Sequence, residues 1–456
     1  MSLQRYGEYK DCRVAWLGKL PTHWAVVRVK HVTGSIEQGW SPQCEGFPVE
    51  TPDEWGVMKV GCVNGGRFRP SENKKLPVEL QPMPQYALKR GDLLISRANT
   101  RELVGSAAVV QDDLDNLLLC DKLYRLRANE GMNQAKYLAY FLGTREARSQ
   151  IELDATGASS SMLNIGQSAI LDLLMPRPSA AEQAAITTFL DRETAKIDAL
   201  IADQEKLITL LAEKRQATIS HAVTKGLNPD VPMKDSGVAW LGEVPEHWDV
   251  RPLKFLAKIG NGSTPNRDNP DYWAEEGFPW LNSSVVNQEE VTEAERFVTE
   301  KALSECHLPV ISPPAILVGI TGQGKTRGMA TQLQFTATVN QHLAYIKPIV
   351  EQLTSIFLLR CLESAYDHLR TESEGAGSTK GAITCDQLGR LRVPAPDLNE
   401  QEQIVSFLEM EVTKMDKLEA DAIRAIALLK ERRSALITAA VTGQIDVRNL
   451  AQEIPA

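Results

Sequence analysis

The sequence predicts an α+β protein in which two mixed α/β domains are separated by two long helices that form an antiparallel coiled coil. Three observations lead to this fold class. Both ends of a module occur twice in the chain, a heptad pattern of apolar residues follows each module's centre, and each centre alternates strand-like with helix-like runs. The length of 456 residues leaves room for about two to four domains of ordinary size.

The first repeated segment is rich in tryptophan and lies near the start of each module. Residues 10–32 read KDCRVAWLGKLPTHWAVVRVKHV, and residues 234–256 read KDSGVAWLGEVPEHWDVRPLKFL. Both contain Trp, Gly, Pro and a His-Trp pair in one register, at an offset of 224 residues. So many matched residues are not expected from composition alone, so the chain contains one module twice.

The second repeated segment follows each centre. Residues 178–224 match residues 396–442 at an offset of 218, including a Glu-Gln pair and an Ala-Val-Thr end. The centres between the repeats, 25–177 and 249–395, match each other poorly. A protein that keeps one scaffold and varies two recognition surfaces has this pattern. An old duplication that drifted without functional meaning remains the alternative.

The second repeated segments have the pattern of long helices. Pro178 and Pro396 precede them, and Gly226 and Gly443 follow them. About 40 residues in a helix span roughly 60 Å. Two such helices are expected to pair antiparallel and act as a spacer, whereas helices packed flat on their own domains are the alternative. Residues predicted to form the coiled-coil seam or a subunit interface are Leu190, Ile197, Leu200, Leu207, Leu211, Leu408, Met415, Leu418, Leu429 and Leu436.

The two centres have a mixed α/β pattern. Predicted helices cover residues 134–151 and 352–369. Each centre ends with a loop of small residues, 157–161 or 375–380, followed by a short strand. The other predicted strands are residues 92–96, 107–110, 315–319 and 343–346, with the final strands at 173–176 and 391–394.

Composition excludes several classes of protein. The seven cysteines are scattered and form no C-x-x-C pair, so neither a disulfide framework nor a metal site is expected. No apolar run approaches membrane-spanning length, and the N-terminal residues lack the pattern of a secretion signal, so a cytoplasmic location is expected.

The net charge of −9 counts against a simple basic DNA-binding domain. Positive charge is therefore expected to be local or to come from other subunits.

Basic and amide side chains nevertheless cluster in predicted loops of both centres. Arg, Lys, Asn and Gln can read the edges of bases through paired hydrogen bonds. One such cluster is Lys122 with Arg125 and Arg127. Each cluster by itself is typical of a solvated surface, but the loops recur at matching places. The candidate DNA-binding residues are Lys89, Arg97, Asn99, Arg101, Lys122, Ser160, Thr321, Gln323, Lys325, Thr326, Arg327, Asn340, Gln341, Ser378 and Lys380.

Two short motifs suggest catalytic alternatives. Residues 319–326, GITGQGKT, match the phosphate-binding pattern G-x-x-x-x-G-K-T, so a P-loop nucleotide-binding protein is the main alternative function. The following residues alternate like strands and do not open a helix, which weakens this interpretation. Residues 269–272, NPDY, approach a methyltransferase motif but lack its second proline. His23 and His247 stand beside tryptophans in the repeated arm, where packing or capping is favoured over acid–base chemistry.

These motifs together resemble the specificity subunit of Type I restriction-modification systems. The resemblance is carried by WLGKLPTHW and WLGEVPEHW, and by PRPSAAEQAAITTFLDRETAKID and APDLNEQEQIVSFLEMEVTKMD. In the second centre, GNGSTPNRDNPDYW and VNQHLAYI are also similar to the family. The first centre departs from the pattern, since it begins GSIEQGWSPQCEGFP. The resemblance covers essentially the whole chain.

The resemblance implies a DNA-recognition subunit that is not itself catalytic. It implies two target recognition domains that bind an asymmetric bipartite double-stranded DNA, helices that bind two methyltransferase subunits, and restriction-translocase subunits that join them. S-adenosylmethionine and ATP with magnesium are expected in those partners, with no cofactor in this chain. A coiled-coil scaffold without DNA contact is a further alternative. The implied domains are 1–178 with the N-terminal arm, spacer helix 179–227, 228–396 with the repeated arm, and 397–456 with the second spacer helix and tail.

Overall fold

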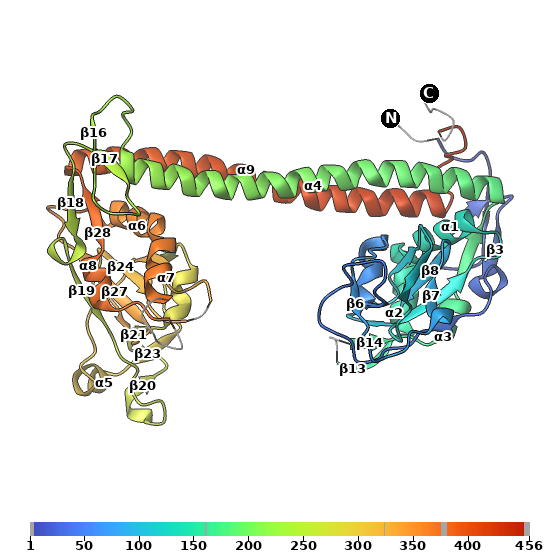
Figure 1. The fold of residues 1–456 in the computed structure, drawn as a ribbon, viewed down its shortest axis with the longest axis horizontal. Coiled ribbons are helices and arrows are strands. Elements are labelled where there is room, and N and C mark those ends of the chain that lie inside the picture. The colour runs from blue at the N-terminus through green and yellow to red at the C-terminus, as the bar shows by residue number, and fades with distance from the viewer. Residues whose placement is uncertain (1–3, 160–161, 323, 375–380, 451–456) are drawn as a thin grey trace. The chain divides into compact units, whose positions relative to one another are not determined.

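The structure, a computed structural model, describes residues 4–159, 162–322, 324–374 and 381–450. Contacts between residues divide the chain into two compact units. Unit 1 comprises residues 1–204 and 424–456, and unit 2 comprises residues 205–423. This division passes through both long helices, α4 (Ala180–Lys225) and α9 (Leu398–Val441). Each unit therefore contains one globular domain and parts of both helices (Figure 1).

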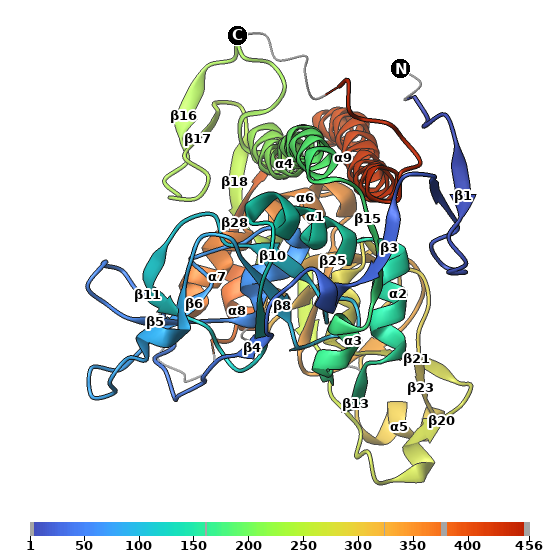
Figure 2. The same cartoon turned by 90° about the vertical axis from the view of Figure 1, so that its right-hand side faces the viewer.

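The globular domain of unit 1 is built on two four-stranded sheets, with strand orders β10-β8-β12-β4 and β6-β5-β11-β7. The helix α1 packs on β8 and β10 (Figure 2). The strands are β1 (Tyr9–Asp11), β2 (Lys19–Pro21), β3 (Ala25–Arg28), β4 (Glu37–Gln38), β5 (Gly56–Met58), β6 (Asn73–Lys75), β7 (Ala87–Leu88), β8 (Asp92–Ser96), β9 (Ala98–Asn99), β10 (Ala107–Val109), β11 (Leu114–Leu118), β12 (Leu123–Arg127), β13 (Thr156–Ser159), β14 (Met162–Asn164) and β15 (Leu174–Arg177). The shorter helices are α1 (Met132–Leu142), α2 (Arg145–Leu153) and α3 (Gln167–Leu171).

The globular domain of unit 2 has a five-stranded sheet, β19-β27-β24-β25-β22, and a smaller sheet, β20-β23-β21-β26. Its strands are β16 (Met233–Asp235), β17 (Glu243–Pro245), β18 (Asp249–Pro252), β19 (Ala257–Asn261), β20 (Trp273–Ala274), β21 (Phe278–Leu281), β22 (Glu290–Val291), β23 (Arg296–Val298), β24 (Ala315–Gly319), β25 (Ala330–Leu333), β26 (Thr338–Val339), β27 (Leu343–Pro348) and β28 (Arg392–Ala395). Its shorter helices are α5 (Glu300–Glu305), α6 (Ser355–Ser364), α7 (Tyr366–Glu374) and α8 (Cys385–Arg390).

The central strands confirm the alternating pattern in the sequence, since β8, β10, β24 and β27 lie where strands were predicted. The prediction of one continuous helix within each centre was wrong, because each predicted range is covered by two helices. In unit 1, α1 ends at Leu142 and α2 begins at Arg145. Thr144 starts the second helix, since its hydroxyl accepts a hydrogen bond from the Ala147 amide at 3.3 Å. Of the predicted loop 157–161, residues 157–159 belong to strand β13, whereas 160–161 and 375–380 lie outside the described residues.

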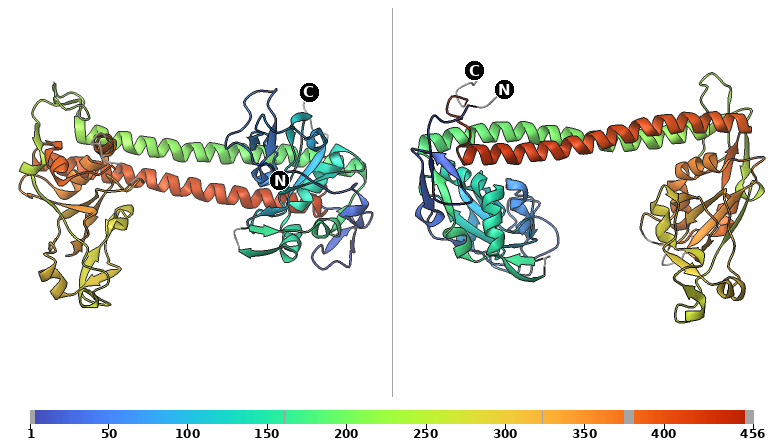
Figure 3. Two further views of the ribbon diagram at one scale, coloured as in Figure 1. Left: turned by 60° about the horizontal axis from the view of Figure 1, so that its bottom comes forward. Right: turned by 180° about the vertical axis from the view of Figure 1, so that it is seen from behind.

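The long helices run antiparallel within each unit, as predicted (Figure 3). In unit 1, Arg433 Nε donates to Asp198 Oδ1 at 3.0 Å. In unit 2, Arg215 pairs with Asp416. Both aspartates and both arginines are related by the repeat offset of 218 residues. The same interhelical ion pair therefore occurs once in each unit, which reflects the internal pseudo-twofold repeat.

Only some of the predicted seam residues are covered. Leu200, Leu207 and Leu418 are 50%, 37% and 51% exposed, so their assignment to the seam was wrong. An α-helix has 3.6 residues per turn, so a seven-residue repeat drifts by about 20° per heptad and does not stay on one face of a straight helix. Among the other predicted residues, Leu190, Ile197, Leu211, Leu408 and Met415 are buried, and Leu429 and Leu436 are partly buried.

A glutamate at the start of each long helix binds the repeated arm. Glu182 Oε1 lies 2.8 Å from His23 Nε2 and accepts a hydrogen bond from Trp24 Nε1 at 3.3 Å. The corresponding Glu400 binds His247 Nε2 and Trp248 Nε1, both at 2.9 Å. The two His-Trp pairs therefore attach each arm to the helix that follows its own domain.

In each unit, the C-terminal end of the other long helix packs beside the same tryptophan. Gly443, which follows α9, has φ of +68°, and a Cβ there would lie 2.5 Å from Pro21 and 3.1 Å from Trp24. Gly226, which follows α4, has φ of +72°, and its Cβ would lie 3.2 Å from Trp248. A residue with a side chain would be strained in this backbone region at both positions, and at Gly443 it would also collide with Pro21 of the arm. Each unit thus joins one arm, the beginning of one long helix and the end of the other.

Glu182 should make the stability of unit 1 depend on pH. Burial alone would raise the pKa of this carboxyl, but hydrogen bonds from His23, Trp24 and Ser179 outweigh burial and lower the pKa below its usual value of 4.5. The folded state therefore binds fewer protons, so the stabilisation is complete above about pH 4.5 and is lost as the pH falls through the folded pKa.

Glu182→Gln tests this pH dependence by urea unfolding followed by circular dichroism. We expect the substitution to lower the free energy of unfolding by about 2 kcal/mol at neutral pH, because hydrogen bonds to a charged acceptor are lost. The difference between wild type and variant should shrink below pH 4.5. A difference that stays constant down to pH 3 would contradict the assigned role.

Candidate nucleic-acid interface

Three segments of unit 1 meet at the carboxyl end of the central strand β8. The Arg97 amide donates to Lys122 O at 2.9 Å, which joins the loop after β8 to the turn before β12. The Ile165 amide donates to Arg97 O at 3.0 Å, and Asn99 on β9 pairs with Leu163 on β14. The structure therefore brings Arg97, Asn99 and Lys122 together at one edge of the domain.

The side chains at this edge differ in exposure. Arg101 and Lys122 are exposed. Arg97 is partly buried, and its guanidinium donates to Asp121 O at 3.3 Å. Asn99 donates to Asn64 Oδ1 at 3.3 Å, so the amides of two distant segments are held together. Arg, Lys and Asn side chains are types that bind base edges or phosphates.

The same three segments meet in unit 2 at the carboxyl end of β24. The Ile320 amide donates to His342 O at 3.0 Å, and the Ile383 amide donates to Ile320 O at 2.8 Å. Thr321 Oγ1 lies 2.8 Å from His342 Nδ1. The exposed Gln341 accepts a hydrogen bond from Thr264 at 2.6 Å. Thr321 and Gln341 are therefore gathered at a place that corresponds to the edge in unit 1.

Several candidate residues do not belong to these edges. Lys89 lies at the opposite end of β8, where it pairs with Asp115, so the structure does not bring it to the other candidates. Arg327 is only 3% exposed and binds Glu374, and Asn340 is 5% exposed and accepts from the His342 amide. Their assignment as DNA contacts was wrong, because burial directs their polar groups to protein partners. Ser160, Gln323, Ser378 and Lys380 lie outside the described residues.

Sequence reasoning also missed residues that the structure places at the edges. Asn64 comes from a distant segment and carries no local signal, whereas Thr264 lies in the motif GNGSTPNRDNPDYW, which does not by itself show its contact with Gln341. His342 follows Gln341 directly, but its contact with Thr321 depends on the pairing of β24 with β27. In the basic cluster at residues 122–127, Arg125 is buried against protein acceptors, because β12 lies inside its sheet and is buried on both faces from Leu123 to Leu126.

The P-loop interpretation does not fit the local geometry. Strand β24 is followed by β25, which pairs with it antiparallel. The Gly328 amide donates to Gly319 O at 2.8 Å and closes the described parts of the loop as a hairpin. A phosphate-binding loop of that kind instead joins a strand to a helix whose N-terminus faces the phosphates. The exposed Lys325 and the partly buried Thr326 therefore belong to a strand–loop–strand element.

The NPDY segment is a local turn. Asn269 Oδ1 accepts a hydrogen bond from the Asp271 amide at 3.1 Å, and Asp271 pairs with Lys301 at 2.7 Å. Among the described residues, no cluster of His, Cys, Asp or Glu could hold a metal ion. In the same residues, no helix has the length and hydropathy needed to cross a membrane.

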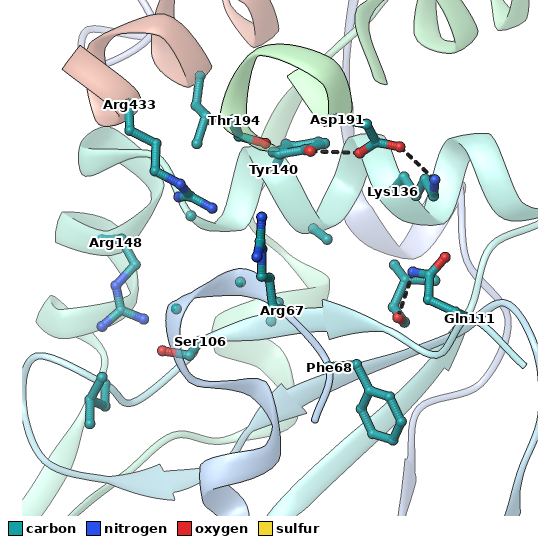
Figure 4. A pocket seen from close by; sticks show the side chains of 18 of the residues that line it. Arg67, Phe68, Ser106, Gln111, Lys136, Tyr140, Arg148, Asp191, Thr194 and Arg433 are labelled. Carbon is teal, nitrogen blue, oxygen red and sulfur yellow. Dashed lines mark hydrogen bonds and ion pairs between the residues drawn. The ribbon is translucent and has the colours of Figure 1, made fainter. Parts of the chain in front are cut away.

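A cavity of about 610 Å³ lies within unit 1, between the globular domain and the long helices (Figure 4). Its four cationic side chains already have partners. Arg67 and Arg433 both pair with Asp198, at 2.6 and 3.0 Å. Lys136 pairs with Asp191 at 2.6 Å, and Arg148 donates to backbone carbonyls. The cavity therefore marks the junction of domain and helices, where Arg67 of the domain shares one aspartate of α4 with Arg433 of α9.

This chain is similar to known specificity subunits of Type I restriction enzymes. The family model described as Type I restriction modification DNA specificity domain matches residues 245–426. The EcoEI specificity subunit of Escherichia coli is 29% identical over 206 residues, which cover 45% of this chain and 34% of that one. The MjaX specificity subunit of Methanocaldococcus jannaschii is 24% identical over 98% of this chain and 99% of its own length.

Solved structures have the same fold. A chain from a study of complex assembly and conformational transition of a Type I restriction-modification system superposes with a TM-score of 0.65, at 18% identity, over 92% of this chain and 98% of that one. The HsdS subunit of Thermoanaerobacter tengcongensis superposes with a TM-score of 0.52, at 18% identity, over 93% of this chain and 98% of its own. Motifs, repeat and fold agree, and the chain is similar over its whole length to Type I restriction-modification specificity subunits.

Proposed function

We propose that this chain recognises an asymmetric bipartite DNA target and that each unit reads one part of it. One observation carries the proposal: three equivalent segments meet at the carboxyl end of the central strand in both units, but with different side chains. Unit 1 presents Arg97, Asn99 and Lys122, whereas unit 2 presents Thr321 and Gln341. Different donors and acceptors on one framework would select different bases.

The charge of the chain favours action within a complex. A protein of net charge −9 attracts phosphates poorly, and phosphate contacts supply much of the affinity of DNA-binding proteins. Partner subunits would supply the missing positive charge. We propose two methyltransferase subunits that hold S-adenosylmethionine, and restriction-translocase subunits that use ATP with magnesium. In this proposal the chain itself performs no catalysis.

Exposed leucines on the long helices support two copies of one partner. Leu200 and Leu418 are related by the repeat offset of 218 and are 50% and 51% exposed. Leu210 and Leu428 share the same offset and are 50% and 59% exposed. Unit 1 contains Leu200 and Leu428, and unit 2 contains their counterparts. Equivalent apolar positions in both units suit two identical subunits that cover them.

Leu418→Asp tests this docking surface. We expect it to weaken binding of one methyltransferase subunit by about thirtyfold, as for a central apolar residue of an interface. Because the leucine is exposed, the free energy of unfolding of the free chain should change by less than about 0.5 kcal/mol. Native mass spectrometry should show complexes with one methyltransferase subunit, and the double variant with Leu200→Asp should show none. The proposal is wrong if Thr413→Asp, an exposed position on the same helix, has the same effect.

Methylation mapping tests DNA recognition itself. Cells that express this chain with its cognate methyltransferase subunit should carry adenine methylation in one bipartite motif. Exchange of residues 25–177 for the corresponding centre of a relative should change only one half of that motif. Methylation without a shared motif would favour a scaffold that does not contact DNA, and a change in both halves would exclude one unit per half.

A further inference from the structure

The loop after the central strand of unit 1 is fastened to helix α2 by one arginine. Arg148 Nη2 donates to Glu102 O at 2.9 Å and to Arg101 O at 3.5 Å. Its Nη1 donates to Val104 O. This one guanidinium therefore binds three carbonyl groups of the loop that also carries Asn99 and Arg101.

In unit 2, an arginine on helix α7 binds loop carbonyls in a similar way. Arg370 Nη1 donates to Gly324 O at 2.7 Å and lies 3.4 Å from Arg327 O. The neighbouring Tyr366 hydroxyl donates to Lys325 O at 2.8 Å and accepts from Arg370 at 3.1 Å. The carbonyls belong to the loop after β24, which carries Thr321 and Lys325.

The loops also approach these helices in the same way. Gly105 has φ of +77°, and a Cβ there would lie 2.8 Å from Ile151 and 3.2 Å from Arg148. Gly328 has φ of +89°, and its Cβ would lie 3.3 Å from Tyr366 and 3.6 Å from Arg370. A glycine at the end of each loop thus lets the backbone come close enough for the arginine to reach its carbonyls.

A guanidinium suits this task because it presents several donors in one rigid plane. Its usual partners are carboxylates, whereas these three acceptors of Arg148 are neutral carbonyls. Burial lowers the pKa of Arg148, as expected for a cation that has lost water. Both arginines bind main-chain carbonyls of a loop, so their effect on DNA would pass through the conformation of that loop.

We propose that Arg148 and Arg370 are positioning residues, each of which sets the base preference of one half of the target by fixing the recognition loop of its own unit. This inference rests on the proposed function, because it assigns the loops after β8 and β24 to the reading of bases. Arg148 and Arg370 would affect specificity without contacting DNA. A loop released from its arginine can adopt several conformations, and it accepts substituted bases more readily.

The test uses the full chain with its methyltransferase subunits and duplexes that carry the mapped motif or a single substitution in one half. Arg148→Ala is expected to reduce discrimination in the half read by unit 1 by about tenfold, as for the loss of buried hydrogen bonds to a charged donor, and to leave the other half unchanged. Arg370→Ala should do the reverse. Arg148→Lys should restore part of the discrimination, because an ammonium can reach one carbonyl but not three.

Two controls separate positioning from general damage. Arg145→Ala removes an exposed arginine from the same helix and should leave both halves unchanged. Hydrogen exchange should become faster at the amides of residues 99–105 in Arg148→Ala while the rest of unit 1 stays protected. If Arg148→Ala fails to fold, Arg148→Lys and Arg148→Gln provide the same comparison. Equal loss in both halves, or unchanged discrimination with both arginines replaced, would overturn the inference. A wild-type complex without base preference would instead refute the proposed function.

Discussion

Replacement of Trp24 by alanine is expected to lower the free energy of unfolding of unit 1 by about 3–5 kcal/mol. The side chain is fully buried, packs beside the end of α9 and donates to Glu182 at the start of α4. Its loss would leave a cavity where an arm and two long helices meet. Trp248→Ala should have the same effect on unit 2, since Trp248 is equally buried and binds Glu400.

Urea unfolding followed by circular dichroism measures this effect without relying on tryptophan fluorescence. Trp16→Ala is the matched control, because Trp16 lies in the same arm but is only partly buried. We expect it to cost less than half as much. Trp24→Phe keeps most of the volume and removes the hydrogen bond, and it should cost about 1 kcal/mol beyond the loss of packing. Equal losses for Trp16→Ala and Trp24→Ala would show that the arm does not join the helices as described.

Asp92→Ala is the second substitution with a large expected effect. Asp92 is 1% exposed and accepts hydrogen bonds from the Lys89 amide at 2.9 Å and from Arg127 Nε at 2.8 Å. It also lies 3.5 Å from Nη1 of the buried Arg125. Removal of the Asp92 carboxylate leaves the buried guanidinium of Arg125 with less negative charge around it. This should lower the free energy of unfolding by about 3–5 kcal/mol.

The matched control for this substitution is Asp115→Ala. Asp115 pairs with Lys89, but its side chain is 77% exposed, so its removal should cost less than about 1 kcal/mol. Because β8 leads at its other end into the loop that we propose to read bases, Asp92→Ala should also weaken DNA binding through unit 1. The ion-pair assignment is refuted if both variants unfold at the same urea concentration.

The candidate interface was only partly predictable from the sequence. Predicted residues such as Arg97, Asn99, Thr321 and Gln341 do gather at the ends of the central strands. Exposure could not be predicted in the same way. Arg327 lies in the same basic loop as the exposed Lys325, yet it is buried against Glu374. A run of polar residues shows that a loop is polar, but not which of its side chains turn inward.

The sequence by itself determined the duplicated module, the two long helices and the alternation of strands and helices in the centres. Each of these follows from repeats or from periodicity among neighbouring residues, which local backbone geometry enforces. The tertiary structure alone decided which residues meet across long distances. Examples are Glu182 with His23, Asp198 with Arg433, and Arg148 with the loop at 101–104. Such contacts depend on how folded elements pack, and no periodicity in the chain encodes their partners.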